Sequence, residues 1–183
     1  MKRIAMLIVG LMSVWTMFAV SFPHVTEMPV ADYFPMVTAG NVAAICTDAR
    51  DYPVVGIAAG MLADDIERVT GFRPEVRHDL PKGASIVAGT LGKSHLIDGL
   101  VKSRSIDVSG IRGKWESFIV ATIEHPKSHT PLLVIVGSDR RGTAFGLTSL
   151  SEAIGVSPWY WWADAQNLPV RPGCRITKHF NIQ

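Results

Sequence analysis

The strongest constraint on the fold is a pair of strand patterns joined by a short polar turn. Residues 117–124 are rich in β-forming side chains, with Phe118, Val120 and Thr122 at alternate positions, and residues 132–136 form an uninterrupted apolar run. The segment 125–131 between them contains two prolines and predicts a hairpin, while the all-apolar run predicts a central strand covered on both faces. Because a hairpin is antiparallel, the sheet must be mixed, which excludes an all-parallel doubly wound fold.

The remaining pattern alternates strands and helices. Apolar residues recur at three- or four-residue spacing after Pro53, with Asp51 as the expected N-cap, charged residues on the opposite face and Gly71 as the stop. The other expected elements are strands over 42–46, 74–77 (an edge strand) and 85–88, a turn over 89–92, a helix over 93–101, and a last helix that follows residues 139–142 and ends at Gly155. The order β-α-β-β-α-β-β-α predicts an α/β sandwich in which helices flank a mixed sheet.

The N-terminus has the pattern of a secretory signal peptide. Lys2 and Arg3 precede an apolar run over 4–20, and Ala19 and Ser21 suit cleavage by signal peptidase. A retained membrane anchor is the alternative, because the run is about as long as a minimal spanning helix. We therefore expect a secreted or periplasmic protein with a signal peptide (1–21), a linker (22–40), one α/β domain (41–166) and a C-terminal tail or bridge (167–183).

The net charge of the mature chain argues against some classes of binding partner, whereas the two cysteines leave the redox state open. Cleavage after Ser21 reduces the 18 basic residues to 16, which equals the number of acidic residues. A neutral domain lacks the clustered basic face that nucleic acids require, and after cleavage nothing predicts a membrane contact. Cys46 and Cys174 either pair in an oxidising compartment or remain thiols, and the sequence leaves both open.

Several short motifs are better explained by turns and exposed helix faces than by catalysis or ligand binding. The segment 89–94 resembles a phosphate-binding loop, but Val87 stands where that loop needs a glycine. The histidines form no helical zinc-binding pair, since His125 and His129 flank a turn, and there is no Gly-x-Ser-x-Gly elbow. Asp64 and Asp65 lie on the charged face of a helix, where carboxylates serve solubility. We expect no cofactor, no metal site and no catalytic residue in this chain.

Arg140 and Arg141 are one candidate contact. They lie between a buried strand and a helix N-terminus, where free N–H groups and the helix dipole favour anions, so they suit a carboxylate such as that of a uronic acid. The alternative is that Asp139 caps the helix and pairs with one of the two arginines.

An aromatic segment is the other candidate. Four aromatic residues, Trp159, Tyr160, Trp161 and Trp162, follow a proline and precede Asp164. They are too many for one small core, so we favour an interface with a further domain. Direct stacking on sugar and internal packing stay open as alternatives.

Several blocks in order resemble the N-terminal domain of glycoside hydrolase family 115. They are residues 62–71, 86–92, 113–118, 136–143, 150–155 and 156–164, and the resemblance spans about Val42 to Asp164. It implies a secreted enzyme that removes glucuronic or 4-O-methylglucuronic acid from xylan with inversion. It also implies an α/β sandwich like the N-terminal domains of hexosaminidases and α-glucuronidases, followed by a (β/α)₈ barrel that carries the catalytic acid and base.

The sequence ends at Gln183, where the family continues into the barrel. We therefore expect a non-catalytic accessory domain, a fragment whose missing partner is the barrel and whose parent enzyme acts on glucuronoxylan. The alternatives are a free-standing carbohydrate-binding module that uses the aromatic segment with Arg140 and Arg141, or an inactive remnant.

Overall fold

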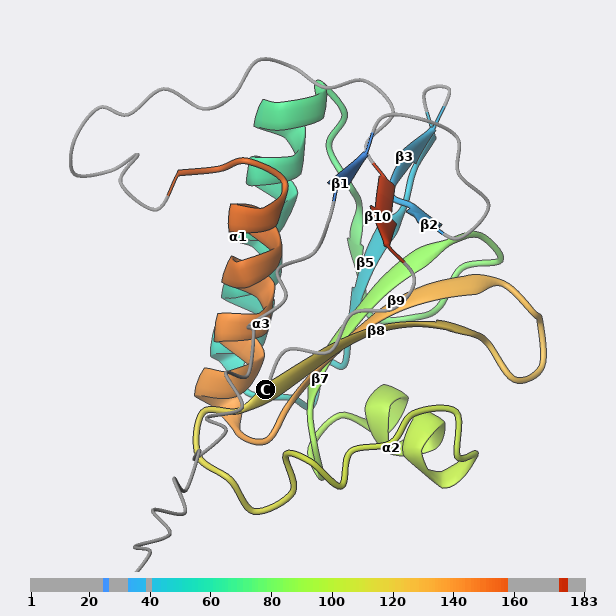
Figure 1. The fold of residues 1–183 in the computed structure, drawn as a ribbon, viewed down its shortest axis with the longest axis vertical. Coiled ribbons are helices and arrows are strands. Elements are labelled where there is room, and N and C mark those ends of the chain that lie inside the picture. The colour runs from blue at the N-terminus through green and yellow to red at the C-terminus, as the bar shows by residue number, and fades with distance from the viewer. Residues whose placement is uncertain (1–24, 27–32, 39–40, 158–174, 178–183) are drawn as a thin grey trace, which may run out of the picture.

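A five-stranded mixed sheet forms the centre of the protein. The computed structural model describes residues 25–26, 33–38, 41–157 and 175–177 (Figure 1). The strand order in the main sheet is β6-β5-β7-β9-β8. Its strands are β5 (Ala44–Thr47), β6 (Val76–Arg77), β7 (Ser85–Thr90), β8 (Phe118–Glu124) and β9 (Pro131–Gly137). The first four in that order run parallel, and β8 pairs antiparallel with β9, as the hairpin pattern predicts.

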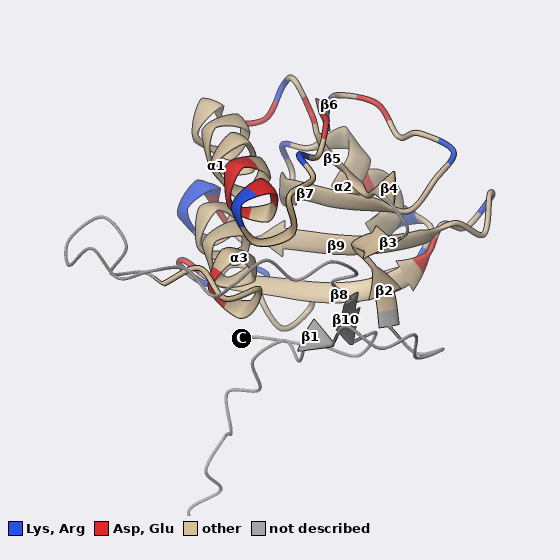
Figure 2. Cartoon of the chain, turned by 90° about the horizontal axis from the view of Figure 1, so that it is seen from above, with Lys and Arg blue, Asp and Glu red and all other residues tan. Residues whose placement is uncertain are grey.

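Three helices cover the two faces of this sheet. They are α1 (Pro53–Thr70), α2 (His95–Lys102) and α3 (Arg140–Ala153). Figure 1 shows α1 and α3 side by side on one face and α2 on the other. The strands β7 and β9 in the middle of the sheet carry no charged residue (Figure 2). The α/β sandwich with a mixed sheet and the predicted element order are confirmed.

The central strand β9 contributes to both hydrophobic cores. Leu133 and Ile135 pack in the core beneath α1 and α3, whereas Leu132, Val134 and Val136 pack in the core beneath α2. Successive side chains of a strand point to opposite faces, so a strand covered on both sides must be apolar throughout. This explains the uninterrupted apolar run in the sequence.

A proline marks the start of the main helix α1, and a glycine marks its end. Pro53 occupies the first turn, and Gly71 adopts the left-handed conformation with φ of 80° at the C-cap. The prediction that Asp51 caps this helix is wrong. Tyr52 stands at the N-cap without a side-chain bond, because Asp51 accepts hydrogen bonds from the N–H groups of Tyr52 and Thr90 instead.

Short strands extend the fold beyond the predicted domain core. They are β1 (Val25–Thr26), β2 (Tyr33–Pro35), β3 (Val37–Thr38), β4 (Asn41–Val42) and β10 (Arg175–Thr177). Part of the segment expected as a linker is therefore structured, since Phe34 and Met36 are fully buried in the core beneath α1 and α3. In the expected tail, β10 pairs antiparallel with both β1 and β2. The sequence missed these strands because each is only two or three residues long.

Gly146 of α3 and Gly56 of α1 form a matched pair that tests helix packing. A Cβ at Gly146 would lie 2.6 Å from Ile135 Cγ2, whereas one at Gly56 would meet nothing within 4 Å. We expect Gly146→Ala to lower the free energy of unfolding by about 1–3 kcal/mol through overpacking. Gly56→Ala should raise it by roughly 0.4–1 kcal/mol, because alanine is the better helix former. Urea denaturation measures both, and equal effects would contradict the close packing of α3 on β9.

Candidate functional site

The carboxyl ends of the parallel strands are the first place to look for a site. The chain leaves β5 and β9 toward α1 and α3 on one face of the sheet, and leaves β7 toward α2 on the other (Figure 1). The neighbours β5 and β7 therefore form a topological switch point, where open α/β sheets commonly bind ligands.

Two carboxylates of the chain itself occupy this switch point. Asp51 Oδ2 accepts from the Thr90 N–H at 2.7 Å, and Asp48 Oδ2 accepts from the His95 N–H at the start of α2 at 2.6 Å. Burial opposes the charged form of Asp48, but bonds from the N–H groups of Arg50 and His95 outweigh it and hold the pKa below its ordinary value of 3.8. The N–H groups of residues 90–95 after β7 are thus bonded within the chain, to carboxylates or to backbone carbonyls, and Ser94 caps α2.

A third carboxylate organises the start of α3. Asp139 Oδ1 accepts from the N–H groups of Arg141 and Gly142 at 2.9 and 2.8 Å, and its Oδ2 accepts from Glu116 N–H at 2.8 Å. Burial works against the charge, yet these three donors together lower the pKa of Asp139 below 3.8. Asp139 is therefore both the helix N-cap and the anchor of the loop that precedes β8.

The two candidate arginines lie at this helix terminus. Arg141 pairs with Glu116 at 3.0 Å, and its guanidinium lies 5.7 Å from the ring centre of Phe145. Both arginines are exposed and line a hollow of about 290 Å³ that reaches Tyr52 and Val54 at the start of α1. The capping alternative is confirmed for Asp139, but the partner of Arg141 is Glu116. Recognition of a carboxylate by Arg140 and Arg141 stays a prediction.

Trp115 is a functional candidate that the sequence analysis did not single out. Its side chain is 86% exposed, in the loop that Asp139 anchors through Glu116. The loop is further fixed by two bonds between Ser117 and Ser138: the Ser138 N–H donates to the Ser117 carbonyl, and the Ser117 N–H donates to the Ser138 hydroxyl. Glu116 has a φ of 53°. A fixed and exposed indole is a feature of sugar-binding and protein-binding surfaces. In the sequence, Trp115 lies in a Gly-Lys-Trp turn and belongs to no apolar repeat. This is the signal that could have indicated its exposure.

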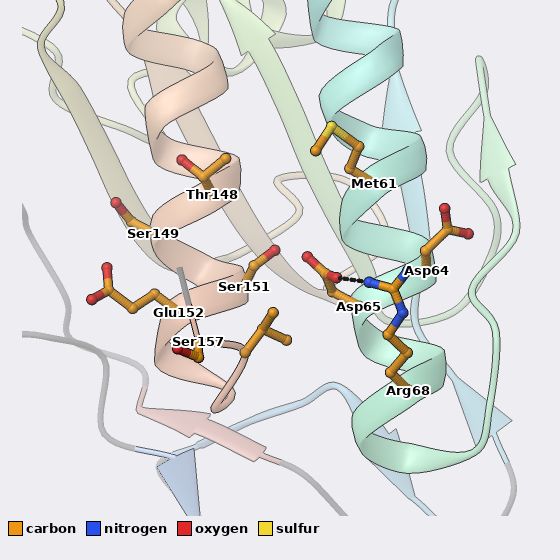
Figure 3. A pocket seen from close by; sticks show the side chains of 10 residues that line it. Met61, Asp64, Asp65, Arg68, Thr148, Ser149, Ser151, Glu152 and Ser157 are labelled. Atoms are coloured by element: carbon orange, nitrogen blue, oxygen red, sulfur yellow. Dashed lines mark hydrogen bonds and ion pairs between the residues drawn. The ribbon is translucent and has the colours of Figure 1, made fainter. Parts of the chain in front are cut away.

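A groove runs between the C-terminal parts of α1 and α3 (Figure 3). It has a volume of about 330 Å³. Asp65 and Ser151 face each other across it, and Arg68 pairs with Asp65 at 2.9 Å (Figure 3). Its lining residues are Met61, Asp64, Asp65 and Arg68 from α1, Thr148, Ser149, Ser151 and Glu152 from α3, and Val156 and Ser157 after it. The candidates Trp159, Tyr160, Trp161, Trp162 and Asp164 lie outside the described residues.

The described part of the chain offers little other chemistry. Within it, no three His, Cys, Asp or Glu residues gather as metal ligands, and no helix is long and apolar enough to span a membrane. Cys46 is a free thiol at the centre of the sheet; burial raises its pKa to about 11 although a bond with Ser85 lowers it. Such a thiol is inert as a nucleophile, and Cys174 lies outside the described residues.

The fold and its site define an α/β sandwich domain in which aspartates at the strand ends bind backbone N–H groups of the chain itself. No family profile matches the sequence, and none of the curated proteins matches it. Among solved structures, the chain is similar to a family 115 4-O-methyl-α-glucuronidase described as specific for decorated arabinogalactans. The two share 30% sequence identity and a TM-score of 0.62 over 75% of this chain.

This chain spans 16% of that enzyme. The predicted resemblance to family 115 is thus supported at the level of the fold, and the chain is related to part of a glycoside hydrolase. Its place at the N-terminus of such an enzyme and its separation from the catalytic barrel stay predictions.

The role of Asp139 can be tested by its pH dependence. A carboxylate whose pKa is lowered by folding stabilises the protein fully above its unfolded pKa, and that contribution disappears as the pH falls through the folded value. We expect Asp139→Ala to lower the free energy of unfolding by about 1 kcal/mol at pH 7. This difference from the wild-type protein should shrink as the pH falls below 3.8. Asp139→Asn keeps a cap oxygen and should be milder. Urea titrations at pH 7 and below pH 3.8 measure the effects, and a difference between the wild-type protein and Asp139→Ala that is independent of pH would contradict this role.

Proposed function

We propose that this chain is an accessory domain of a secreted glycoside hydrolase of family 115 that releases glucuronic or 4-O-methylglucuronic acid from a plant polysaccharide. The observation that carries the proposal is the match to a 4-O-methyl-α-glucuronidase at 30% identity over 75% of the chain, with a TM-score of 0.62. The signal-peptide pattern of residues 1–21 supports secretion.

The use of the carboxylates supports a role outside catalysis. Glycosidases need two carboxyl groups that converge on one glycosidic bond at roughly 5–10 Å. Asp48, Asp51 and Asp139 are committed to backbone N–H groups, and the charged face of α1 is committed to ion pairs with Arg68 and Arg73. The catalytic acid and base of the parent enzyme would then come from a different domain.

The substrate of the parent enzyme is proposed as a class. The resemblance implies glucuronoxylan, whereas the similar solved enzyme is described as specific for decorated arabinogalactans. Both readings have a (4-O-methyl)glucuronic acid side chain as the group released. The domain described here does not by itself select between the two polymers.

We expect the mature chain alone to release no uronic acid from glucuronoxylan or from decorated arabinogalactan. Chromatography of the products after long incubation measures this, and the solved 4-O-methyl-α-glucuronidase is the positive control on decorated arabinogalactan. Free uronic acid in the reaction with the isolated chain would mean that the chain carries its own catalytic groups and would overturn the accessory role.

A carbohydrate-binding module is the second candidate, and the exposed Trp115 favours it. Its indole lies in the loop that is tied to Asp139 and to the ion pair of Glu116 with Arg141. Affinity gel electrophoresis on xylan and on arabinogalactan separates the two functions. We expect no retardation of the wild-type chain; a mobility shift that Trp115→Ala or Trp161→Ala abolishes, and that Phe72→Ala retains, would establish the module instead.

A further inference from the structure

The strand β8 forms an open edge of the main sheet. It is the last strand in the order β6-β5-β7-β9-β8, and within the described residues it pairs with β9 and with no other strand (Figure 2). The Ser138 N–H donates to the Ser117 carbonyl at one end of this pair, and the His125 N–H donates to the Thr130 carbonyl at the other. Because bonded positions alternate along an antiparallel pair, the odd-numbered residues of β8 bond to β9. The even-numbered residues point their N–H and C=O groups outward; they are Phe118, Val120, Thr122 and Glu124.

The outward side of β8 has unused capacity for hydrogen bonds. No hydrogen bond joins its outward backbone groups to any other part of the described chain. The hydroxyl of Thr122 is also the one buried side-chain oxygen or nitrogen without a partner among the described residues. Polar groups that folding removes from water nearly always have a partner. This edge therefore suits a further strand that supplies donors and acceptors.

The side chains of β8 do not protect the edge. Proteins block exposed sheet edges with charged side chains, prolines or bulges. Residues 118–123 contain no charge and no proline, and their register with β9 runs without a bulge. On the α2 side of the sheet, Ala121 and Ile123 are only half-buried, and they line a hollow of about 330 Å³ with the loop after α2. An unprotected edge beside a hollow is a typical site of strand addition.

The backbone of β8 is complementary to a second copy of itself. In an antiparallel pair of two β8 strands centred on Ala121, Val120 of each copy faces Thr122 of the other. By the same count, Phe118 of each copy faces Glu124 of the other. Each of these outward residues therefore meets an outward residue, and the two can exchange N–H···O=C bonds. This arrangement uses all the outward backbone groups of the strand.

The side chains favour this centre over its neighbours. With Ala121 at the centre, Ile119 of each copy faces Ile123 of the other, and branched apolar pairs of this kind stabilise adjacent strands. A shift of the centre by one residue toward the start of the strand would place Glu116 opposite Glu124, and like charges directly opposite destabilise a pair. A shift the other way would bring in the first proline of the hairpin turn, which has no N–H.

We propose that two copies of this chain pair antiparallel through β8, with Ala121 at the two-fold axis, so that their main sheets join into one continuous sheet. The inference concerns assembly and does not depend on the proposed function. A two-fold contact uses the same strand of both copies and closes after two. Trp115 lies three residues before β8 and Lys127 three residues after it, and both are exposed. The indole of each copy then comes beside the ammonium group of the other, which suits a cation–π contact.

Sedimentation equilibrium of the full mature chain tests the assembly. We expect a dimer for the wild-type protein. Ala121→Lys places two like charges at the axis and should raise the dissociation constant of the dimer by roughly tenfold or more. Ala121→Gln has a side chain of similar length without charge and should keep most of the affinity; thermal unfolding checks that both variants are folded. A wild-type monomer at all concentrations would overturn the proposal, and equal weakening by both variants would overturn the assigned centre.

Amide hydrogen exchange locates the contact within the dimer. The N–H of Ile119 points to β9 and is the internal reference, because its exchange should be slow in every state. The N–H groups of Val120 and Thr122 should exchange slowly in the dimer and faster on dilution or in the Ala121→Lys variant. Slow exchange of both in a monomer would mean that the chain itself covers the edge, and fast exchange of both in a dimer would place the contact elsewhere. Either result would overturn the proposal.

Discussion

The burial of β9 on both faces is the constraint on which the rest of the structure depends. One face requires α1 and α3 above it, and the other requires α2 and the loop before β8, because Leu132 to Val136 contribute side chains to both cores. The antiparallel partner β8 closes one side of β9, and the parallel β7 closes the other. With helices committed to both faces and the chain crossing between them, the carboxyl ends of β5, β7 and β9 come together at one edge.

Three aspartates, Asp48, Asp51 and Asp139, lie at that edge. Each carboxylate accepts hydrogen bonds from backbone N–H groups of the chain, and these bonds lower the pKa values of Asp48 and Asp139. These hydrogen bonds join separate elements. Asp51 links β7 to the start of α1, and Asp139 links the Trp115 loop to α3.

Most of the fold could be predicted from local sequence patterns. The wrong or missing predictions share one cause, because they depend on contacts between residues that are far apart in the sequence. Pro53 and Gly71 fixed α1 because their backbone preferences are local. Asp51 looks like a helix cap in sequence, but its partner is Thr90, 39 residues away, which no local pattern reveals. The burial of Phe34 and Met36 depends in the same way on tertiary contacts. For the site, Arg140 and Arg141 were found through their place before a helix, whereas Trp115 was not, because exposure is a property of the folded chain.

The exposed apolar residues in the first half of α1 had a signal in the sequence, and the expectation of an ordinary amphipathic helix concealed it. The charges of α1 are confined to residues 64–68, so averaging over the whole helix gives a polar side that its first half does not have. Taken half by half, the helix is amphipathic only beside the groove and apolar all round before it. A domain that kept this surface in water would expose Ile57, Met61 and Phe145 together at a steady cost in solubility.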